Sequence, residues 1–261
     1  MRRTRILTAL MACLLLAGCS LLSPGADGVD DAGPAIEEDE DFGTVEVYEV
    51  LDDGSLLPEA EGTAAEVWDL FLQVATVDFA AEVVSEYRVG DAPDSDTLAY
   101  VYQDDDPRYW ILAANLATAD DYDLTLATLI HEYAHILTLA TDEFDEPGTC
   151  ADDEEMAEGC PAPGSAIAGF RDTFWAGYDD APAVDNSDED VAWEFYETHE
   201  DDFVSDYAAT NLVEDIAESF MTYVLEDEID ADSVIARKLR FFDDYPELAA
   251  IRERIRADVG R

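Results

Sequence analysis

The chain has 261 residues and is strongly acidic, with 64 Asp and Glu side chains against 13 Lys and Arg and a formal net charge of −51. This charge excludes nucleic acid and anionic lipid headgroups as partners of the folded surface, because both carry the same sign. The length allows one fair-sized domain with extensions, and the acidic exterior is typical of a salt-adapted or highly soluble protein.

The first 18 residues (1–18) have the pattern of a secretory signal. Three arginines precede the apolar stretch 6–17, which is too short to span a bilayer. The stretch runs into Leu16-Ala17-Gly18-Cys19, which resembles the lipobox of bacterial lipoproteins, with cleavage before Cys19 and lipid on its sulfur. An ordinary signal peptide followed by a chance cysteine is the alternative. We predict an extracytoplasmic protein that is anchored to the cell membrane through this N-terminal lipid alone.

Residues 19–43 are rich in Gly, Ala, Pro, Asp and Glu and hold too few apolar side chains to build a core. We predict that this segment is a disordered acidic tether between the lipid and the folded part. The folded domain is then predicted to cover residues 44–261.

The first half of this domain is predicted to be rich in strands. Residues 44–50 alternate between apolar and polar side chains, as a half-buried strand does. Residues 63–75 have the periodicity of a helix. Three further strand-like runs, separated by turn-forming Gly, Pro and Asp residues, cover residues 82–89, 98–103 and 109–117.

The next element, a helix predicted over residues 124–140, contains a metal-binding motif. His131, Glu132 and His135 form the sequence H-E-x-x-H. Histidines four residues apart lie on one helical face, about 5–6 Å apart at Cβ, so both imidazoles can reach one ion. The glutamate can polarise a water molecule on that ion. Two buried, hydrogen-bonded histidines on a core helix are the alternative.

The second half of the domain is predicted to be helical. After an acidic loop at residues 141–164, helices are expected at residues 165–178, 191–200, 211–226, 233–245 and 246–259. Strands that lead directly into a metal-binding helix are the layout of zincin peptidases. We therefore predict an α+β fold with a zincin-like metallopeptidase domain, in which a small N-terminal sheet precedes a mostly helical C-terminal half.

Cys150 and Cys160 lie ten residues apart in the acidic loop. Outside the cytoplasm, such a pair is expected to form a disulfide that closes a short loop. A zinc site built on both thiolates is the alternative, but no histidine lies nearby in the sequence. The acidic run at residues 152–155 is a candidate for binding calcium, yet it lacks the regular spacing of a calcium loop, so solvated charge is favoured.

A catalytic zinc site has three protein ligands and one water, so the motif needs a third ligand. His199 is one candidate, in a polar stretch that is expected to be exposed. Glu214 and Glu218 are favoured, because they share one face of a helix among apolar neighbours, where an unpaired carboxylate is costly. Glu214 also fits the acidic first turn after an Asn211 cap, but that explanation does not extend to Glu218.

Residues 207–220 resemble the zinc region of anthrax lethal factor-type metallopeptidases, and they are similar to bacterial proteins described as zinc-binding metallopeptidases. In that pattern a tyrosine stands seven residues before a glutamate ligand, and a second glutamate stands four residues after it. Tyr207, Glu214 and Glu218 have this spacing. The resemblance implies that Glu218 orients a ligand histidine and that Tyr207 donates a hydrogen bond to the developing oxyanion. Packing in the core is the alternative for Tyr207.

The sequence therefore predicts a secreted, lipid-anchored zinc metallopeptidase that hydrolyses peptide bonds in a protein or peptide substrate. His131, His135 and Glu214 are predicted to hold one Zn²⁺ per chain. Glu132 is predicted to act as general base toward a water molecule that the zinc activates. The alternative is a non-catalytic binding lipoprotein of the cell surface, with a zincin scaffold that a metal stabilises.

Overall fold

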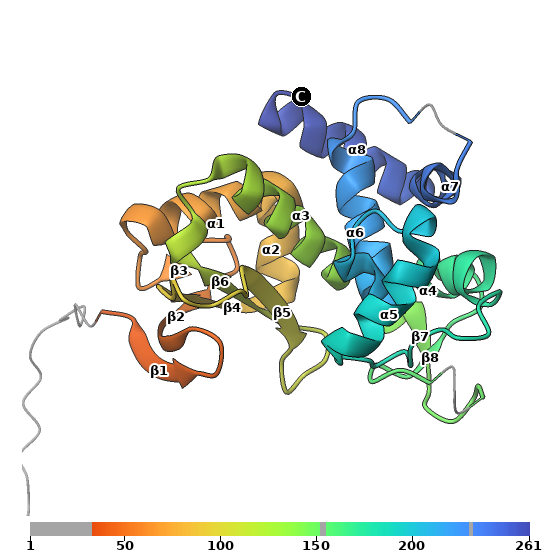
Figure 1. The fold of residues 1–261 in the computed structure, drawn as a ribbon. Helices are drawn as coiled ribbons and strands as arrows, with labels where there is room; N and C mark the ends of the chain where they lie inside the picture. Colours follow the sequence, from red (N-terminus) through yellow and green to blue (C-terminus); the bar gives the residue numbers. More distant parts are fainter. Residues whose placement is uncertain (1–32, 152–154, 230–231) are drawn as a thin grey trace, which may run out of the picture. The chain divides into compact units, whose positions relative to one another are not determined.

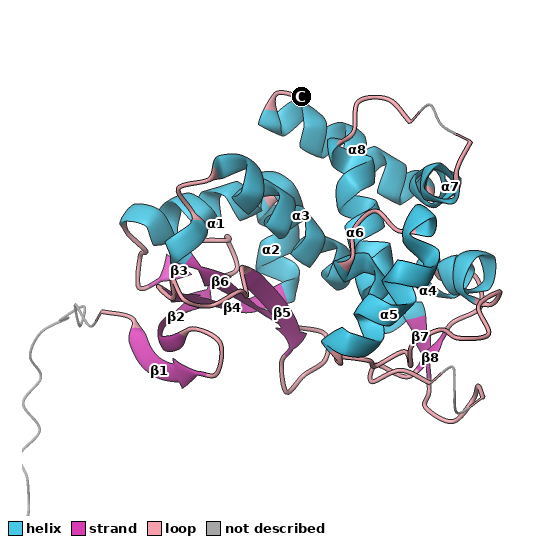
Figure 2. Ribbon diagram, in the orientation of Figure 1, coloured by secondary structure: helices cyan, strands magenta, loops and turns pink. Residues whose placement is uncertain are grey.

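The computed structural model describes residues 33–151, 155–229 and 232–261, and it has a mixed α+β fold (Figure 1). A sheet dominates the N-terminal half of the described chain, and helices dominate the C-terminal half (Figure 2). The predicted signal at residues 1–18, the lipidation site at Cys19 and the first part of the predicted tether lie outside the described residues and stay predictions. Within the described part of the chain, no helix is both long enough and apolar enough to cross a membrane.

Among the described residues, six strands form the main sheet, in the spatial order β1-β2-β4-β6-β5, with β3 beside β2. Their bounds are Ala35–Asp39 (β1), Gly43–Val50 (β2), Leu56–Leu57 (β3), Val84–Gly90 (β4), Ala99–Gln103 (β5) and Trp110–Asn115 (β6). β4 and β6 pair in parallel, and the other pairs of this sheet are antiparallel. Every side chain of β6 is buried, whereas β5 forms an edge of the sheet.

The prediction of a disordered tether at residues 19–43 is wrong at its C-terminal end, where the structure contains strand β1. It pairs with β2 at five positions, and the Phe42 side chain after it is buried. The Asp39 side chain accepts hydrogen bonds from the N–H groups of the two residues before β2, which closes the turn. Arg88 of β4 forms an ion pair with an acidic side chain of β1. The acidic composition hid this strand, because its pairing and charge partners lie later in the chain.

Three helices belong to the first half: α1 (Gly62–Ala75), α2 (Val77–Val83) and α3 (Tyr122–Thr138). α2 replaces the first residues of the strand predicted at residues 82–89. Thr76 ends α1 with a positive φ of 85°, and its hydroxyl accepts the hydrogen bond that caps α2. The strand predicted at residues 109–117 likewise ends early, because the Asn115 side chain caps a 3₁₀ turn.

The helical half contains α4 (Ala166–Phe170), α5 (Glu189–His199), α6 (Leu212–Leu225), α7 (Val234–Phe241) and α8 (Pro246–Val259). α4 continues into a turn of π-helix at Arg171–Trp175, so the helix predicted at residues 165–178 changes its hydrogen-bonding pattern midway. α6 packs directly against α3, and this contact joins the two halves at the predicted motif.

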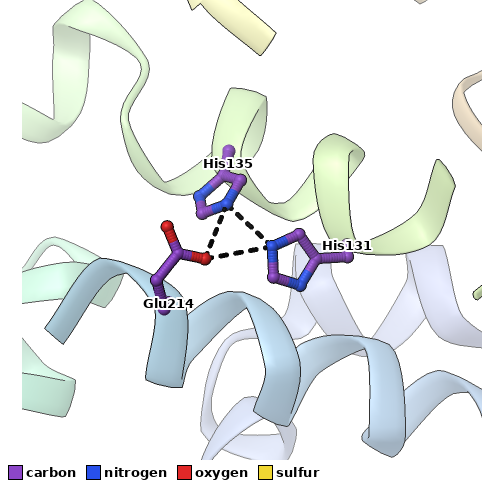
Figure 3. Close-up of side chains that lie close together, drawn as sticks. All are labelled: His131, His135 and Glu214. Carbon is purple, nitrogen blue, oxygen red and sulfur yellow. Dashed lines mark hydrogen bonds and ion pairs between the residues drawn. The ribbon is translucent and has the colours of Figure 1, made fainter. Parts of the chain in front are cut away.

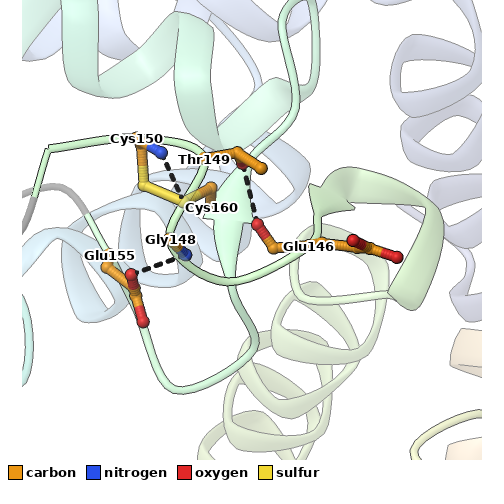
Figure 4. Close-up of a disulfide and its surroundings, with 6 residues drawn as sticks. All are labelled: Glu146, Gly148, Thr149, Cys150, Glu155 and Cys160. Atoms are coloured by element: carbon orange, nitrogen blue, oxygen red, sulfur yellow. Dashed lines mark hydrogen bonds between the residues drawn. A yellow bond between two sulfur atoms is a disulfide. The ribbon is translucent and has the colours of Figure 1, made fainter.

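The predicted acidic loop at residues 141–164 contains a small second sheet, formed by β7 (Phe144–Asp145) and β8 (Cys160–Pro161). Cys150 and Cys160 form a disulfide beside it, and the Cys150 N–H donates a hydrogen bond to the Cys160 sulfur (Figure 4). The Glu155 carboxylate accepts a hydrogen bond from the Gly148 N–H. One covalent bond and several hydrogen bonds therefore connect the described residues of this acidic segment.

Arginines of α8 bind the C-terminal ends of other helices, where the last carbonyl groups lack partners within their own helix. Arg252 donates to the carbonyls of residues 223 and 226 at the end of α6. Arg256 donates to the carbonyl of residue 224, and Arg254 donates to two carbonyls at the end of α1. The arginines of α8 therefore make contacts within the acidic chain, and those of Arg252 and Arg256 tie α8 to the end of α6.

Candidate metal centre

Helix α3 carries the H-E-x-x-H motif into the core. Asp121 caps this helix by accepting a hydrogen bond from the N–H group of Leu124. Apolar side chains of α3 pack within the main core, and the motif is buried with them: His131 is 6% exposed, Glu132 5% and His135 8%. Three buried polar side chains on one helix need polar partners. For the two histidines, the neighbouring helix α6 provides them.

Helix α6 supplies two carboxylates that face the histidines. Asn211 caps α6 by accepting a hydrogen bond from the Glu214 N–H, and the Asn211 amide donates to the Asn186 carbonyl. Glu214 thus occupies the capped first turn of α6, where, as noted from the sequence, an acidic residue is favoured. Its side chain also points toward the histidines (Figure 3). Glu218 follows one turn later on the same helical face.

Three potential ligand atoms converge between α3 and α6 (Figure 3). The Nε2 atoms of His131 and His135 lie 2.9 Å apart. The Oε2 atom of Glu214 lies 3.2 Å from Nε2 of His131 and 3.4 Å from Nε2 of His135. Around a tetrahedral ion with bonds of about 2.0–2.2 Å, ligand atoms lie about 3.3–3.6 Å apart. The donor types fit one metal ion, and the two separations from Glu214 lie in or close to this range, whereas the two histidine nitrogens lie closer together.

Glu218 and Ser205 form a hydrogen-bonded chain that ends at Nδ1 of His131, on the side of the ring away from the ligand group. The Nδ1 atom of His131 lies 2.8 Å from Oε1 of Glu218, and the Ser205 hydroxyl donates to Oε2 of Glu218 at 2.6 Å. With its Nδ1 proton donated to Glu218, His131 presents the lone pair of Nε2 to a metal. Sequence reasoning missed Ser205, because it lies in a stretch without helical periodicity. Nδ1 of His135, by contrast, is buried without a hydrogen-bond partner among the described residues.

The carboxylates favour a positive charge between the two helices. Burial by itself would lower the pKa of His131, but hydrogen bonds with Glu214 and Glu218 raise this pKa to about 10. Burial likewise disfavours the charged form of Glu214, yet the two imidazoles hold the pKa of this carboxyl group below its usual range. The centre therefore suits a cation, and either an imidazole proton or a metal ion can supply that charge.

Glu132 stands beside the ligand group and faces a cleft. Burial raises the pKa of the Glu132 carboxyl group, and the neighbouring imidazoles oppose this rise. The backbone N–H group of Val101 in edge strand β5 also opposes the rise. The cleft has a volume of about 520 Å³ and contacts both His131 and Glu132. Its walls also include Leu98, Ala99, Leu124 and Met221.

Tyr207 lies at the same cleft and is 53% exposed, so the alternative of a tyrosine packed in the core is wrong. Its ring centre lies 5.9 Å from that of His131. Partial burial and the nearby carboxylates of Glu214 and Glu132 raise the pKa of the Tyr207 hydroxyl. The hydroxyl therefore keeps its proton near neutral pH and can donate a hydrogen bond to a group in the cleft.

The other candidate ligands lie elsewhere. Nε2 of His199 lies 3.1 Å from a carboxylate oxygen of Asp180, and its ring packs against Tyr178 and Phe195. The sulfur atoms of Cys150 and Cys160 also lie near a Glu155 oxygen, but both are bonded to each other. The structure therefore does not bring His199 or the cysteines to the motif. The candidate calcium-binding run includes residues 152–154, which lie outside the described residues.

Comparisons of the chain with protein-family models, curated proteins and solved structures gave no match. The chemistry of the site is thus argued from its geometry. Two imidazoles and a carboxylate can bind a metal, a separate carboxylate with a raised pKa can accept a proton, and a phenol can donate a hydrogen bond. All of these groups border one cleft or lie directly behind its wall.

Proposed function

We propose that this protein is a zinc-dependent peptidase with a zincin-like active site. The observation that carries the proposal is the convergence of His131, His135 and Glu214 beside a fourth polar group, Glu132, that borders an open cleft. Two histidines and one glutamate are a ligand set of catalytic zinc, with a further position for water. The lethal factor-type resemblance of residues 207–220 supports the same ligand set.

When bound, zinc supplies a Lewis acid that lowers the pKa of a water molecule toward 7 and polarises a substrate carbonyl. Glu132 is the group of the chain that accepts the proton of the attacking water and delivers it to the leaving amine. Its position suits this double role, because the Glu132 side chain lines the cleft directly after His131 in the chain. Glu218 keeps His131 oriented, and Tyr207 donates a hydrogen bond to the developing oxyanion.

Edge strand β5 suggests how an extended peptide lies in the cleft. The carbonyl of Leu98 and the N–H of Asp104 bond to the β6 side, at Asn115 and Tyr109 respectively. Because successive residues of a strand face opposite edges, Ala99 turns its N–H and carbonyl groups away from β6. Ala99 also lines the cleft. We therefore propose that the substrate backbone pairs with this edge beside the metal.

Metal content and activity together test the proposal. Purified protein should contain one zinc per chain by mass spectrometry and should hydrolyse casein. Chelation should remove both the zinc and the hydrolysis, and added zinc should restore both. A protein that binds zinc but cleaves neither casein nor a peptide library would favour a metal-stabilised binding protein. A protein without affinity for zinc would contradict the proposed site.

Replacing Tyr207 with Phe should reduce kcat by roughly 10²–10³-fold, because one hydrogen bond to the oxyanion is lost. The KM for a peptide and the zinc content should change little, since the ring stays in place. Tyr196→Phe is the matched control, because this tyrosine packs against Trp193 on α5 and is absent from the cleft walls. Equal kcat values for both variants and the parent would remove Tyr207 from the mechanism.

A further inference from the structure

Lys238 is the only lysine of the chain, and it is completely buried on α7. Its Nζ atom lies 2.6 Å from Oδ2 of Asp215 on α6, and it lies 3.8 Å from the centre of the Phe203 ring. Asp215 is completely buried as well. A buried ion pair is weak evidence for stability, because desolvation of two charges offsets their attraction. The presence of this buried pair therefore needs an explanation other than stability. One candidate is that the pair selects a single packing arrangement of the two helices.

Asp215 has partners on two other elements of the chain and one on its own helix. Besides Lys238, it accepts a hydrogen bond from Nε1 of Trp175 at 2.8 Å and one from the Ser219 hydroxyl at 3.3 Å. Trp175 itself packs against Phe203, the ring below the Lys238 ammonium. These contacts tie α6 to α7, to the π-helical turn and to the segment before Tyr207.

The position of Asp215 relates this network to the metal centre. Asp215 and Ser219 directly follow Glu214 and Glu218, so the two pairs lie on adjacent faces of α6, about 100° apart. A rotation of α6 that removed Asp215 from Lys238 would also turn both glutamates away from His131. The contacts of Asp215 therefore specify the rotation at which the two carboxylates face α3.

The same network also holds the segment that contains Ser205. Phe203 lies under the Lys238 ammonium, and Ser205 follows two residues later. Ser205 donates to Glu218, which in turn contacts His131. Loss of the contact at Phe203 would therefore release the segment that places Ser205, with Tyr207 two residues further on.

We infer that Lys238 and Asp215 are positioning residues of the metal centre: their ion pair fixes the rotation of α6 and the path of residues 203–207. This inference rests on the proposed function, because it concerns the affinity of the same site for metal. Apolar side chains of similar size could fill the same volume. They would not, however, select one rotation of α6 through an ion pair.

The double variant Asp215→Leu/Lys238→Met tests the inference, because it removes both charges and leaves no unpaired one. We expect a Tm close to that of the parent but a zinc affinity about 10–100-fold lower, as for loss of other groups that orient ligands. Zinc affinity is measured by competition with a chelator, and the visible spectrum of the Co²⁺-substituted protein reports the ligand geometry. If the double variant has the zinc affinity and the Co²⁺ spectrum of the parent, the ion pair does not position the metal centre.

Two further variants keep the result interpretable. Trp175→Phe removes one hydrogen bond to Asp215 and keeps an aromatic ring at this place, although a smaller one. This variant should weaken zinc binding several-fold even if the double variant does not fold. Unchanged affinity would count against the inference. Arg88→Met breaks two ion pairs in the sheet, away from α6, and should leave zinc binding unchanged.

Hydrogen exchange of the metal-free proteins separates this inference from the proposed function. In the double variant, exchange should be faster in α6 and in residues 203–207, and unchanged in α1. If the parent binds no zinc but this exchange pattern is found, the proposed function fails while the positioning of α6 stands. If exchange in α6 is unchanged, the positioning role fails whatever the parent binds.

Discussion

Replacing Glu132 with Gln should abolish peptide hydrolysis and leave zinc bound. The amide has nearly the same shape and can occupy the same place beside the ligands. It cannot take a proton from water, and loss of a positioned base costs at least about 10²–10⁴-fold in rate. Steady-state kinetics with a peptide substrate and mass spectrometry of the bound metal measure the two effects.

Glu66→Gln is a suitable control for the loss of one negative charge, because Glu66 is exposed on α1. It should leave the rate and the zinc content unchanged. Hydrolysis by Glu132→Gln at the parental rate would show that another group is the base. Loss of zinc from the same variant would show instead that Glu132 belongs to the ligand set.

Elements that depend on local periodicity could be predicted from the sequence. The helices α1, α3, α6 and α8 begin and end within two residues of the predicted ranges. The spacing of His131 and His135 acts within one helix, and so does the spacing of Glu214 and Glu218. Each pair could therefore be recognised from its own segment. That the two helices face each other is a long-range property. The sequence indicated it only indirectly, through two carboxylates among apolar neighbours on one helix and through the resemblance of residues 207–220.

Features that depend on contacts between distant segments could not be predicted in this way. Strand β1 is too acidic to be recognised by itself, and it exists because β2 pairs with it. The helix α2 starts at the positive φ of Thr76, for which the sequence has no clear signature. Ser205 and Lys238 act through partners on other elements, so neither has a local pattern. The supports of the site were thus harder to find than its ligands.

Replacing Glu214 with Ala should leave little bound zinc, whereas replacing Glu218 with Ala should weaken binding by about 10–100-fold. The reason is the place of each carboxylate. Oε2 of Glu214 lies within 3.4 Å of Nε2 on both histidines, where it can share an ion with them. Glu218 contacts His131 at Nδ1, on the opposite side of the ring, and can only orient it. Chelator competition measures both affinities on one scale.

His199→Ala is the third member of this series, because His199 was the alternative ligand and now pairs with Asp180. It should bind zinc as tightly as the parent. If Glu218→Ala loses more affinity than Glu214→Ala, the two glutamates exchange roles, and the ligand lies one turn further along α6. If His199→Ala alone loses zinc, the centre between α3 and α6 is not the zinc site. The expected order of zinc affinities thus depends on which nitrogen of His131 each carboxylate contacts. A carboxylate at Nε2 can share the ion, whereas a carboxylate at Nδ1 can only orient the ring.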